Sequence, residues 1–496
     1  IEARRIQTVK DLALSVPNLQ IVESPGGTSG ATITVRGAST INPAITWEPT
    51  VGMYLDGVFL GKNLGGIFEV AELERVEVLR GPQGTLYGKN TVGGAINLIT
   101  RMPGDEFGGR ADLSVGNEGY TQARLRLDSG QLGIFSGSLT YSNSQRDGFY
   151  DNVDLDPSGG LNPFVQPRSS DEFNDLDSEV WRLDTVWDFT DAFRARYTYD
   201  YSDRENLPSK GQVTNVDPLA FEFNGVGFLA PLLQGYVVPD DENASRISNE
   251  NSRYENSESQ GHALTLDWDL GELALKSITA YRELDYADLI DIDGSNMDLF
   301  HSGRDIDYEQ FSQELQLLGA TDSINYVAGL YYFEEEADVF NPITFFGLFG
   351  APTDDNEYGL DNESWAVYGQ MDWTPAALER LTVTAGLRYT EEDREQYIIH
   401  PNASTGGVGA FSESDSDSWS NTSGNLTLTW NLSDDINFYG RVAQGWKSGG
   451  FNGEAPTAAT FLEGYDEEEV LSYELGMKSR LLDDKVQLNL ALFQNE

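Results

Sequence analysis

The sequence predicts a mostly β protein in which a membrane-spanning antiparallel β-barrel, from about residue 105 to residue 496, follows a smaller domain of residues 1–104. Three observations support this fold class. Apolar and polar residues alternate over long segments, short and long connections alternate between those segments, and Trp and Tyr recur near the ends of the apolar faces.

The alternation is clearest in "RLTVTAGLRYT" at 380–390 and "NLTLTWNL" at 425–432. In the first segment Leu, Val, Ala and Tyr occupy every second position, and Thr, Gly and Arg occupy the others. Because successive side chains of a strand point to opposite sides, each strand has one apolar and one polar face. About fifteen segments of this kind follow residue 105.

A water-soluble β-sandwich alternates as well and is the main alternative. Its strands are usually about five or six residues long, whereas these segments often exceed the roughly 9–11 residues that cross an outer membrane. Aromatic residues also lie where interfacial girdles are expected, at Trp181, Trp187, Tyr197, Tyr201, Trp365 and Trp373. Both features favour the barrel.

The connections between the predicted strands fall into two sets. Tight turns are expected at Ser129–Gln131, Thr190–Asp191, Gly271, Thr321–Asp322, Thr374–Ala377, Ser433–Asp435 and Asp483–Asp484. Long loops are expected at 205–257, 289–304, 341–361, 398–417 and 448–466. This bias is typical of an outer-membrane barrel, with the turns in the periplasm and the long loops outside the cell.

The composition excludes several classes of protein. The chain has 81 acidic and 32 basic residues, a formal net charge of −49, and no cysteine. A nucleic-acid partner is excluded because a strongly acidic chain repels polyphosphate. Neither a disulfide framework nor a thiolate metal site is available.

The glycine-rich segment 80–101 includes the pair Gly88–Lys89, which suggests a phosphate-binding loop. The spacing argues against it, because only three residues separate Gly84 from Gly88 and Asn90 follows the lysine. The following "AINLIT" favours a strand over the helix that such a loop requires. A nucleotide site is therefore not expected.

An enzyme or a metal centre is not indicated either. The three histidines, His262, His301 and His400, lie far apart in the sequence, and no ligand cluster is visible. "DLIDIDGSNMD" at 288–298 has the look of a calcium loop but lacks the required spacing of acids around the glycine. The acidic runs "DDE" at 240–242 and "EEE" at 334–336 are interpreted as solvated loop charges.

The first hundred residues contain several recognisable motifs: "ITVRGAS" at 33–39, "VGMYLDGVFLG" at 51–61, "AELERVEVLRG" at 71–81 and "LRGPQGTLYGKNTVGGAINLITR" at 79–101. They closely resemble the plug domain of TonB-dependent outer-membrane receptors. The resemblance continues in "FSQELQLLG" at 311–319 and "YELGMKSRLLDDKVQLNLALF" at 473–493, so it covers essentially the whole chain.

The resemblance implies a barrel of the 22-strand class whose lumen holds a small N-terminal α+β plug. With about fifteen strands present, about seven more are expected beyond Glu496, and the plug is expected to lack its N-terminal part. The implied protein is a receptor in the outer membrane of a Gram-negative bacterium. It would import a scarce, bulky nutrient, most commonly a ferric siderophore, with energy delivered by the TonB protein of the inner membrane.

The expected partners are therefore TonB, outer-membrane lipid and a small-molecule ligand; no cofactor and no catalytic residue are expected. A carbohydrate, haem-like or cobalamin-like ligand is the alternative within the family. A passive porin is the alternative in another class, although a porin would not devote about a hundred residues to filling its channel.

Site residues follow from the same resemblance. The glycines Gly37, Gly81, Gly84, Gly88, Gly93 and Gly94 are expected to be structural, because glycine permits close backbone approach and positive φ. The ligand is expected to meet the upper loops of the plug, with Trp47, Asn63 and Phe68 as candidate contacts. Arg36 and Arg80 match plug arginines that meet barrel glutamates in this family, and Glu314 and Glu474 are the matching glutamates.

Further arginines fall on the polar, lumen-facing register of their strands, namely Arg124, Arg126, Arg182, Arg194, Arg196, Arg388 and Arg441. They are expected either to steer an anionic ligand or to pair with carboxylates of the plug and of neighbouring strands.

Overall fold

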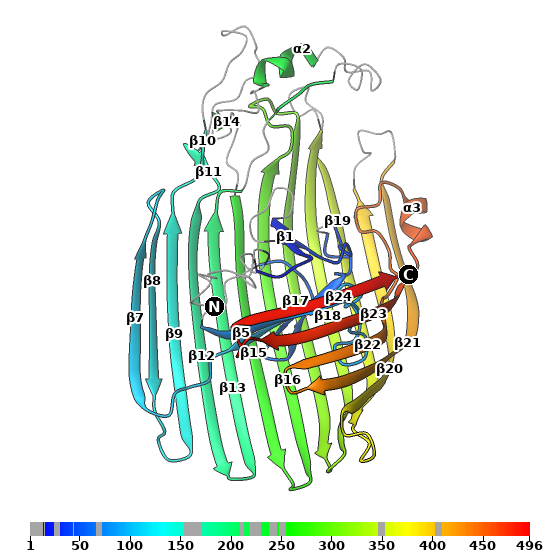
Figure 1. Ribbon diagram of the computed structural model, residues 1–496. Helices are drawn as coiled ribbons and strands as arrows, with labels where there is room; N and C mark the ends of the chain where they lie inside the picture. Colours follow the sequence, from blue (N-terminus) through cyan, green and yellow to red (C-terminus); the bar gives the residue numbers. More distant parts are fainter. Residues whose placement is uncertain are drawn as a thin grey trace.

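A computed structural model describes residues 13, 15–23, 30–42, 44–65, 72–152, 170–208, 213–217, 230–237, 246–247, 254–345, 353–401 and 409–496. In these ranges a large antiparallel sheet curls around a small N-terminal domain (Figure 1). No helix of this part of the chain is both long and apolar enough to cross a membrane.

The large sheet has fifteen strands, each paired with its neighbours along the chain, and ends at β7 and β24. Its strands are β7 (Phe107–Val115), β8 (Thr121–Ser129), β9 (Phe135–Arg146), β12 (Leu176–Thr190), β13 (Phe193–Asn206), β15 (Tyr254–Asp269), β16 (Leu273–Asp291), β17 (Phe300–Ala320), β18 (Ile324–Phe345), β19 (Asp354–Trp373), β20 (Leu381–His400), β21 (Phe411–Ser433), β22 (Ile436–Lys447), β23 (Glu468–Leu481) and β24 (Val486–Asn495). The predicted mostly β class and the strand number are confirmed.

The predicted alternation sets which side chains face inward. On β20, Leu387 is 59% exposed on the outer surface, whereas Arg388 is only 4% exposed on the inner one. Beyond Arg388, every second residue up to His400 is buried. The polar face therefore lines the lumen, and the apolar face is left for lipid.

By strand order, all seven predicted tight turns lie at one end of the sheet, and the longer connections lie at the other. In Figure 1 the turns between the earlier strands, such as β12 and β13, are at the bottom of the view. We refer to the end with the longer connections as the apical end. The strands reach further into it than predicted: β18 ends at Phe345 and β19 begins at Asp354, so most of the predicted loop 341–361 is sheet. The predicted loops 289–304 and 398–417 are shortened in the same way, because cross-strand pairing continues beyond the apolar stretches.

Short elements decorate the apical connections. These are β10 (Tyr150–Asn152), β11 (Glu172–Phe173), β14 (Arg246–Ile247), α2 (Ala230–Leu233), a 3-10 turn (Gln234–Tyr236) and α3 (Ala458–Glu463). The last begins after Thr457, whose hydroxyl accepts a hydrogen bond from the backbone N–H of Thr460, and it ends at Gly464 with φ 63°.

The N-terminal domain has two small sheets. One pairs β1 (Leu19–Glu23) with β2 (Ala31–Val35), and the other has the order β4 (Val58–Leu60), β3 (Val51–Leu55), β6 (Gly94–Thr100), β5 (Leu73–Arg80). The "AINLIT" segment is the central strand β6, as its β-branched content predicts. Buried aliphatic side chains such as Val35, Met53 and Ile96 form a core of its own.

Candidate functional site

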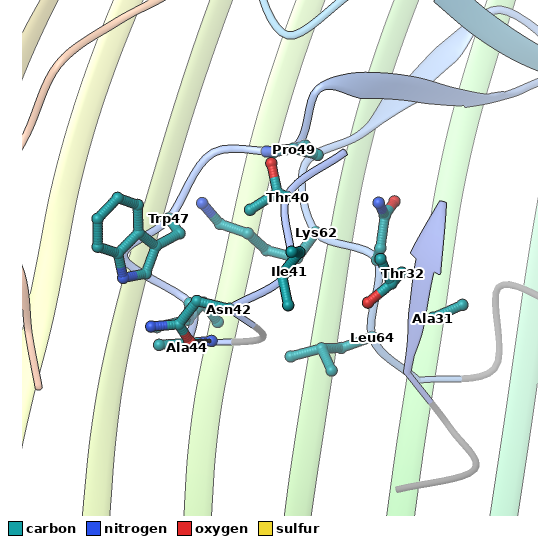
Figure 2. A pocket seen from close by; sticks show the side chains of 12 residues that line it. Ala31, Thr32, Thr40, Ile41, Asn42, Ala44, Trp47, Pro49, Lys62 and Leu64 are labelled. Carbon is teal, nitrogen blue, oxygen red and sulfur yellow. Dashed lines mark hydrogen bonds between the residues drawn. The ribbon is translucent and has the colours of Figure 1, made fainter. Parts of the chain in front are cut away.

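A cleft opens in the plug between the connection that follows β2 and the segment that follows β4 (Figure 2). It is lined by Ala31, Thr32, Thr40, Ile41, Asn42, Ala44, Ile45, Trp47, Pro49, Lys62, Asn63 and Leu64. Two predicted ligand contacts, Trp47 and Asn63, therefore lie on the same cleft. The third, Phe68, falls outside the described residues.

The connection between β22 and β23 covers one side of this cleft. The ring of Trp47 stacks on Tyr465 with 4.5 Å between centroids and 8° between planes. The Tyr465 hydroxyl donates to the carbonyl oxygen of Thr46 at 2.9 Å, and the backbone N–H of Gly453 donates to the Thr46 hydroxyl at 3.3 Å. One face of Trp47 is thus occupied by the protein itself.

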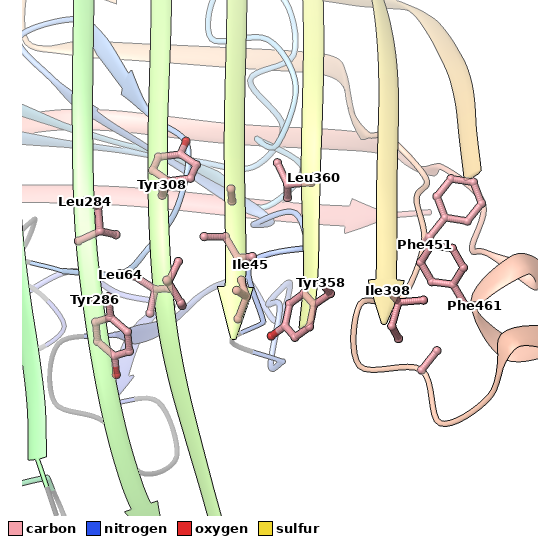
Figure 3. Close-up of a cluster of buried hydrophobic side chains, with 14 residues drawn as sticks. Ile45, Leu64, Leu284, Tyr286, Tyr308, Tyr358, Leu360, Ile398, Phe451 and Phe461 are labelled. Carbon is pink, nitrogen blue, oxygen red and sulfur yellow. The ribbon is translucent and has the colours of Figure 1, made fainter. Parts of the chain in front are cut away.

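Apolar contacts join the plug to the apical half of the barrel (Figure 3). Ile45 and Leu64 of the plug pack among lumen-facing side chains of β16 to β20 and against Phe451 and Phe461 of the connection after β22. The barrel members include Leu284, Tyr286, Tyr308, Tyr358, Leu360 and Ile398. This packing fixes the height of the cleft relative to the strands.

Six buried charged side chains meet beside the cleft. Glu48, Lys62 and Lys89 come from the plug, and Glu335, Glu392 and Arg394 come from β18 and β20. We refer to these six residues as the apical charge network. Three cations face three anions, so the network is electrically balanced.

The contacts of the network differ in length. Arg394 Nη2 lies 2.5 Å from Glu48 Oε1 and 2.8 Å from Glu392 Oε1. Lys89 Nζ lies 2.7 Å from Glu392 Oε2. Lys62 Nζ is further from its partners, at 3.4 Å from Glu48 Oε1 and 3.2 Å from Glu335 Oε1.

Neutral donors complete the coordination of the carboxylates. Glu335 accepts hydrogen bonds from the Tyr308 hydroxyl at 2.8 Å and from Asn362 Nδ2 at 2.7 Å. Glu48 also accepts one from Asn90 Nδ2. Burial alone would raise the pKa of Glu48, but Lys62, Lys89 and Arg394 hold that pKa far below its ordinary value.

This network was missing from the sequence prediction. The sequence indicates no role for Lys89 once a phosphate loop is excluded, and the run "EEE" at 334–336 predicts that Glu335 is a solvated loop charge. The interpretation of Glu335 is wrong, because it lies within β18 and is 1% exposed. A signal existed in the alternation, since Phe333, Glu335 and Ala337 share one face of the strand. The other predicted loop charges, at 240–242, lie outside the described residues.

A second group of ion pairs joins the plug to β12 and β13. Asp56 Oδ2 lies 2.7 Å from Arg182 Nη2 and 3.1 Å from Arg196 Nη2. Both arginines also contact Asp184 of β12. Burial opposes ionisation of Asp56, but the two guanidinium groups and Thr100 lower its pKa.

Comparison with known proteins agrees with this architecture. The family profile described as "TonB dependent receptor-like, beta-barrel" matches residues 124–496, and the "TonB-dependent Receptor Plug Domain" profile matches residues 1–95. The chain belongs to the TonB-dependent receptor family. Its place is the Gram-negative outer membrane, and the family consists of transporters and receptors rather than enzymes.

Individual TonB-dependent receptors are similar over most of the chain. The pesticin receptor of Yersinia pestis is 26% identical over 485 residues, which cover 95% of this chain and 63% of that receptor. The vitamin B12 transporter BtuB of Vibrio vulnificus is 27% identical over 226 residues, which cover 42% of this chain and 34% of that transporter. The chain thus spans less than two thirds of the pesticin receptor's length.

Among solved structures, the ferric yersiniabactin uptake receptor FyuA from Yersinia pestis superimposes with a TM-score of 0.81 at 20% identity, covering 99% of this chain and 70% of that one. The likeness shows a shared fold, a barrel that holds a plug.

The structure brings together one of the two expected arginine–glutamate pairs of a TonB-dependent receptor. Arg36 Nη2 lies 2.6 Å from Glu474 Oε2, and both side chains are buried. The Tyr439 hydroxyl donates to Glu474 Oε1 at 2.5 Å. The Arg36 guanidinium also lies 4.1 Å from the ring centroid of Phe493.

The expectation that Arg80 also meets one of these glutamates, and that Glu314 meets a plug arginine, is corrected by the structure. Arg80 Nη1 donates to the carbonyl oxygen of Pro17 at 3.4 Å and makes no ion pair within the described ranges. Glu314 instead accepts a hydrogen bond from the Tyr368 hydroxyl at 2.5 Å. The guanidinium of Arg388 lies 5.2 Å from the Tyr368 ring centroid, so a barrel cation occupies the surroundings of Glu314.

The predicted plug glycines have positive φ or lie where a Cβ would meet close neighbours. A Cβ at Gly84 would come 2.7 Å from the carbonyl oxygen of Gln444 on β22, to which the Gly84 N–H donates at 3.2 Å. A Cβ at Gly94, where φ is +146°, would come 2.1 Å from the Leu79 carbonyl oxygen. Gly37, Gly81 and Gly88 also have positive φ, and Gly93 is closely surrounded by Ala38, Val51 and Thr50.

Most of the predicted lumen arginines have protein partners. Arg126, Arg182, Arg194 and Arg196 form ion pairs with carboxylates. Arg441 donates to the Pro82 carbonyl oxygen of the plug at 2.6 Å. Neither Arg124 nor Arg388 forms an ion pair with a carboxylate at 4.0 Å or less within the described part of the chain. Most of the predicted lumen arginines therefore serve to pair with other groups of the protein and not to attract a ligand.

Within the described residues, one group of possible metal ligands lies where β16 ends and β17 begins. Asp291, Asp293 and His301 bring one ligand atom each to within 4.8 Å of one another, which the sequence spacing did not signal. The carboxylates already fold the loop: Asp291 Oδ1 accepts from the backbone N–H of Asp293, and Asp293 Oδ1 accepts from that of Ser295. These bonds compete with any ion for the same oxygens.

Proposed function

We propose that this protein imports a ferric siderophore across the outer membrane with energy supplied through TonB. The observation that carries the proposal is the filled lumen: a plug held by buried ion pairs on two sides, with a cleft of aromatic and polar residues at the apical end. A pore for passive diffusion needs an open channel, whereas an energised importer needs a closed one. The similarity to FyuA, a ferric yersiniabactin uptake receptor, supports the ligand class.

Growth tests the import function. A strain without the gene should fail to grow on at least one ferric siderophore as its sole iron source, and the complemented strain should grow only when TonB is present. A panel that also contains haem, cobalamin and oligosaccharides separates the alternative ligands. The similarity to BtuB over 226 residues is the reason to include cobalamin. Normal growth of the deletion strain on every compound would contradict import by this protein.

Conductance tests the distinction from a porin. The protein in a planar bilayer should conduct weakly, and deletion of residues 1–104 should produce a large conductance. Large and equal conductance of both forms would identify a passive pore.

A further inference from the structure

A polar cavity of about 580 Å³ lies between the plug and β19 to β23. Its barrel wall is close to the tight turns, because Thr429 and Asn437 flank the turn between β21 and β22. Its plug wall is formed by residues between Val78 and Tyr87. Small-molecule sites usually measure about 300–1,000 Å³, so the cavity is large enough to hold a ligand.

Strand register explains why this space is open. Four lumen-facing residues lie side by side on β20 to β23, namely Thr384, Thr427, Arg441 and Glu474. The threonine side chains are short and leave a gap between the barrel and the plug. Nearer the apical end, larger side chains such as Tyr308 and Tyr358 pack in the corresponding space.

Cations outnumber anions in the described lining of this cavity. Its cationic side chains are those of Arg36, Arg80, Arg441 and Lys478. Its only carboxylate is that of Glu474, which is already paired with Arg36 at 2.6 Å. Three positive charges therefore remain unbalanced in a chain whose formal net charge is −49. A cleft lined by one sign of charge attracts ions of the other sign.

The three remaining cations have neutral partners. Arg441 Nη2 donates to the Pro82 carbonyl oxygen at 2.6 Å, and Arg80 donates to another plug carbonyl oxygen at 3.4 Å. Lys478 Nζ lies 5.7 Å from the ring centroid of Tyr439. Within the described part of the chain, none of the three forms an ion pair of 4.0 Å or less. An anionic group in the cavity would supply the missing negative charge.

One plug segment spans the distance between the apical charge network and the cavity. Lys89 contacts Glu392 of the network, and Pro82 lines the cavity. Between them, the segment is held to β22 by backbone hydrogen bonds, from the Asn90 N–H to the Trp446 carbonyl oxygen at 3.0 Å and from the Gly84 N–H to that of Gln444 at 3.2 Å. Displacement of this segment would join the two regions along β22.

We propose that this cavity is a second binding site, which holds an anionic ligand on the periplasmic side of the plug. The site takes carboxylate or phosphate oxygens. Arg441 and Lys478 bind them through charge-assisted hydrogen bonds, and the hydroxyl of Thr427 and the amide of Asn437 add neutral ones. That the occupant is the imported ligand rests on the proposed import function.

The charge of the cavity is tested with methanethiosulfonate reagents on the full chain in detergent. The chain has no cysteine, so Thr427→Cys provides a single thiol, directly opposite Arg441. The rate with the anionic sulfonatoethyl reagent is divided by the rate with the cationic trimethylammonium reagent. This ratio should exceed that of a small thiol in solution by at least about tenfold, since such a field changes association rates by roughly 10–10³.

Substitutions in the cavity assign the effect to its cations. Added Arg441→Gln or Lys478→Gln should lower the ratio severalfold. Lys276→Gln is the matched control, because Lys276 also lies near a tight turn but pairs with Asp267 at 3.8 Å and does not line the cavity. A ratio like that of the small thiol, no response to either cavity substitution, or an equal response to Lys276→Gln would each overturn the proposal.

Citrate and its uncharged trimethyl ester test binding at constant ionic strength. Citrate should slow modification of Thr427→Cys by the anionic reagent, and the ester should not. The protection should disappear when Arg441→Gln and Lys478→Gln are combined. Equal effects of citrate and the ester, or protection that persists in the combined variant, would contradict an anion site.

In cells, the occupant is tested with a compound whose use requires this protein in the growth panel. Adding it should slow modification of Thr427→Cys by the anionic reagent, and only when TonB is present. Slowing without TonB would assign the cavity to anions of the periplasm such as phosphate, and no slowing at all would also overturn its role in import. If a deletion strain grows on every compound of the panel, the import function fails, whereas the rates in detergent still decide whether the cavity binds anions.

Discussion

The inner and outer faces of β16 to β20 differ in whether their charged side chains are balanced by charges of opposite sign. On the inner face, Glu335, Glu392 and Arg394 are almost fully buried and balanced by the plug. On the outer face, a row of carboxylates crosses all five strands in register, from Glu283 through Glu309, Glu336 and Asp361 to Glu395. No basic residue interrupts this row.

The difference teaches that an acidic excess is tolerated on the outer face of these strands, whereas the charges of the apical charge network inside are balanced. Four of these outer carboxylates, Glu309, Glu336, Asp361 and Glu395, are exposed. Where water surrounds them, it screens the repulsion between neighbours, so like charges are tolerated. Hydrogen bonds help as well, since the Tyr281 hydroxyl contacts Glu283 at 2.8 Å and Glu309 at 2.6 Å. Inside, where water is excluded, each charge needs a partner of opposite sign.

The largest loss of plug anchoring is expected when a charged side chain of the inner face is removed. Glu392→Ala leaves both Lys89 and Arg394 without one of their partners in a buried site. We expect the plug to lose about 3–5 kcal/mol of its anchoring free energy. Hydrogen exchange of β3 and β6 in the full chain, together with basal conductance in a bilayer, measures this loss. Unchanged exchange and conductance would show that the network does not hold the plug.

Low pH should weaken the ion pairs that join the plug to the barrel through Glu48 and Asp56. The folded-state pKa values of Glu48 and Asp56 are held below their ordinary values of 4.5 and 3.8. A carboxyl group of this kind contributes stability above its unfolded-state pKa, and the contribution is lost as the pH falls through the folded-state pKa. We therefore expect anchoring to be constant above about pH 5 and to weaken progressively below about pH 4. Conductance recorded from pH 7 to pH 3 provides the measurement, and weakening between pH 5 and pH 8 would contradict it.

A smaller loss of plug anchoring is expected when Glu474 is removed. Its partner Arg36 still contacts the ring of Phe493 after the ion pair is lost. A double-mutant cycle of Arg36→Ala and Glu474→Ala should give a coupling energy of about 1.5–3 kcal/mol, the range for hydrogen bonds to charged groups. The cycle of Arg80→Ala and Glu314→Ala should give none, because these residues pair elsewhere. Coupling in the second cycle and not in the first would reverse the assignment.

The smallest effect is expected on the outer face and has the opposite sign. Glu336→Gln removes a carboxylate that lies opposite Glu309 and Asp361. We expect it to raise the unfolding free energy by up to about 1 kcal/mol at low salt, since like charges directly opposite are destabilising. The neighbouring Glu335→Gln should lower it, because that side chain points inward. The midpoint of denaturant unfolding at two salt concentrations measures the change in stability of each variant. A change of the same sign in both variants would contradict the difference between the two faces.

The sequence by itself determined the barrel. Period-two alternation and the two kinds of connection depend only on residues close together in the chain, so the strands, the inward face of Arg388 and the tight turns could be read directly. The resemblance to TonB-dependent receptors predicted the plug and the pairing of Arg36 and Arg80 with barrel glutamates, and of these residues only Arg36 and Glu474 form an ion pair. Strand ends were less well predicted, since cross-strand pairing extends β18 and β19 through polar segments.

Only the tertiary structure decided which charges face one another. Glu48 meets Arg394 and Lys62 meets Glu335 across 346 and 273 residues of chain. Alternation shows that Glu335 points inward, but its partner depends on how deep the plug lies in the lumen and on the register of strands that follow much later in the sequence. Ion pairing depends on distances of a few ångströms, and no local sequence pattern specifies such a distance between segments that meet only in the tertiary structure.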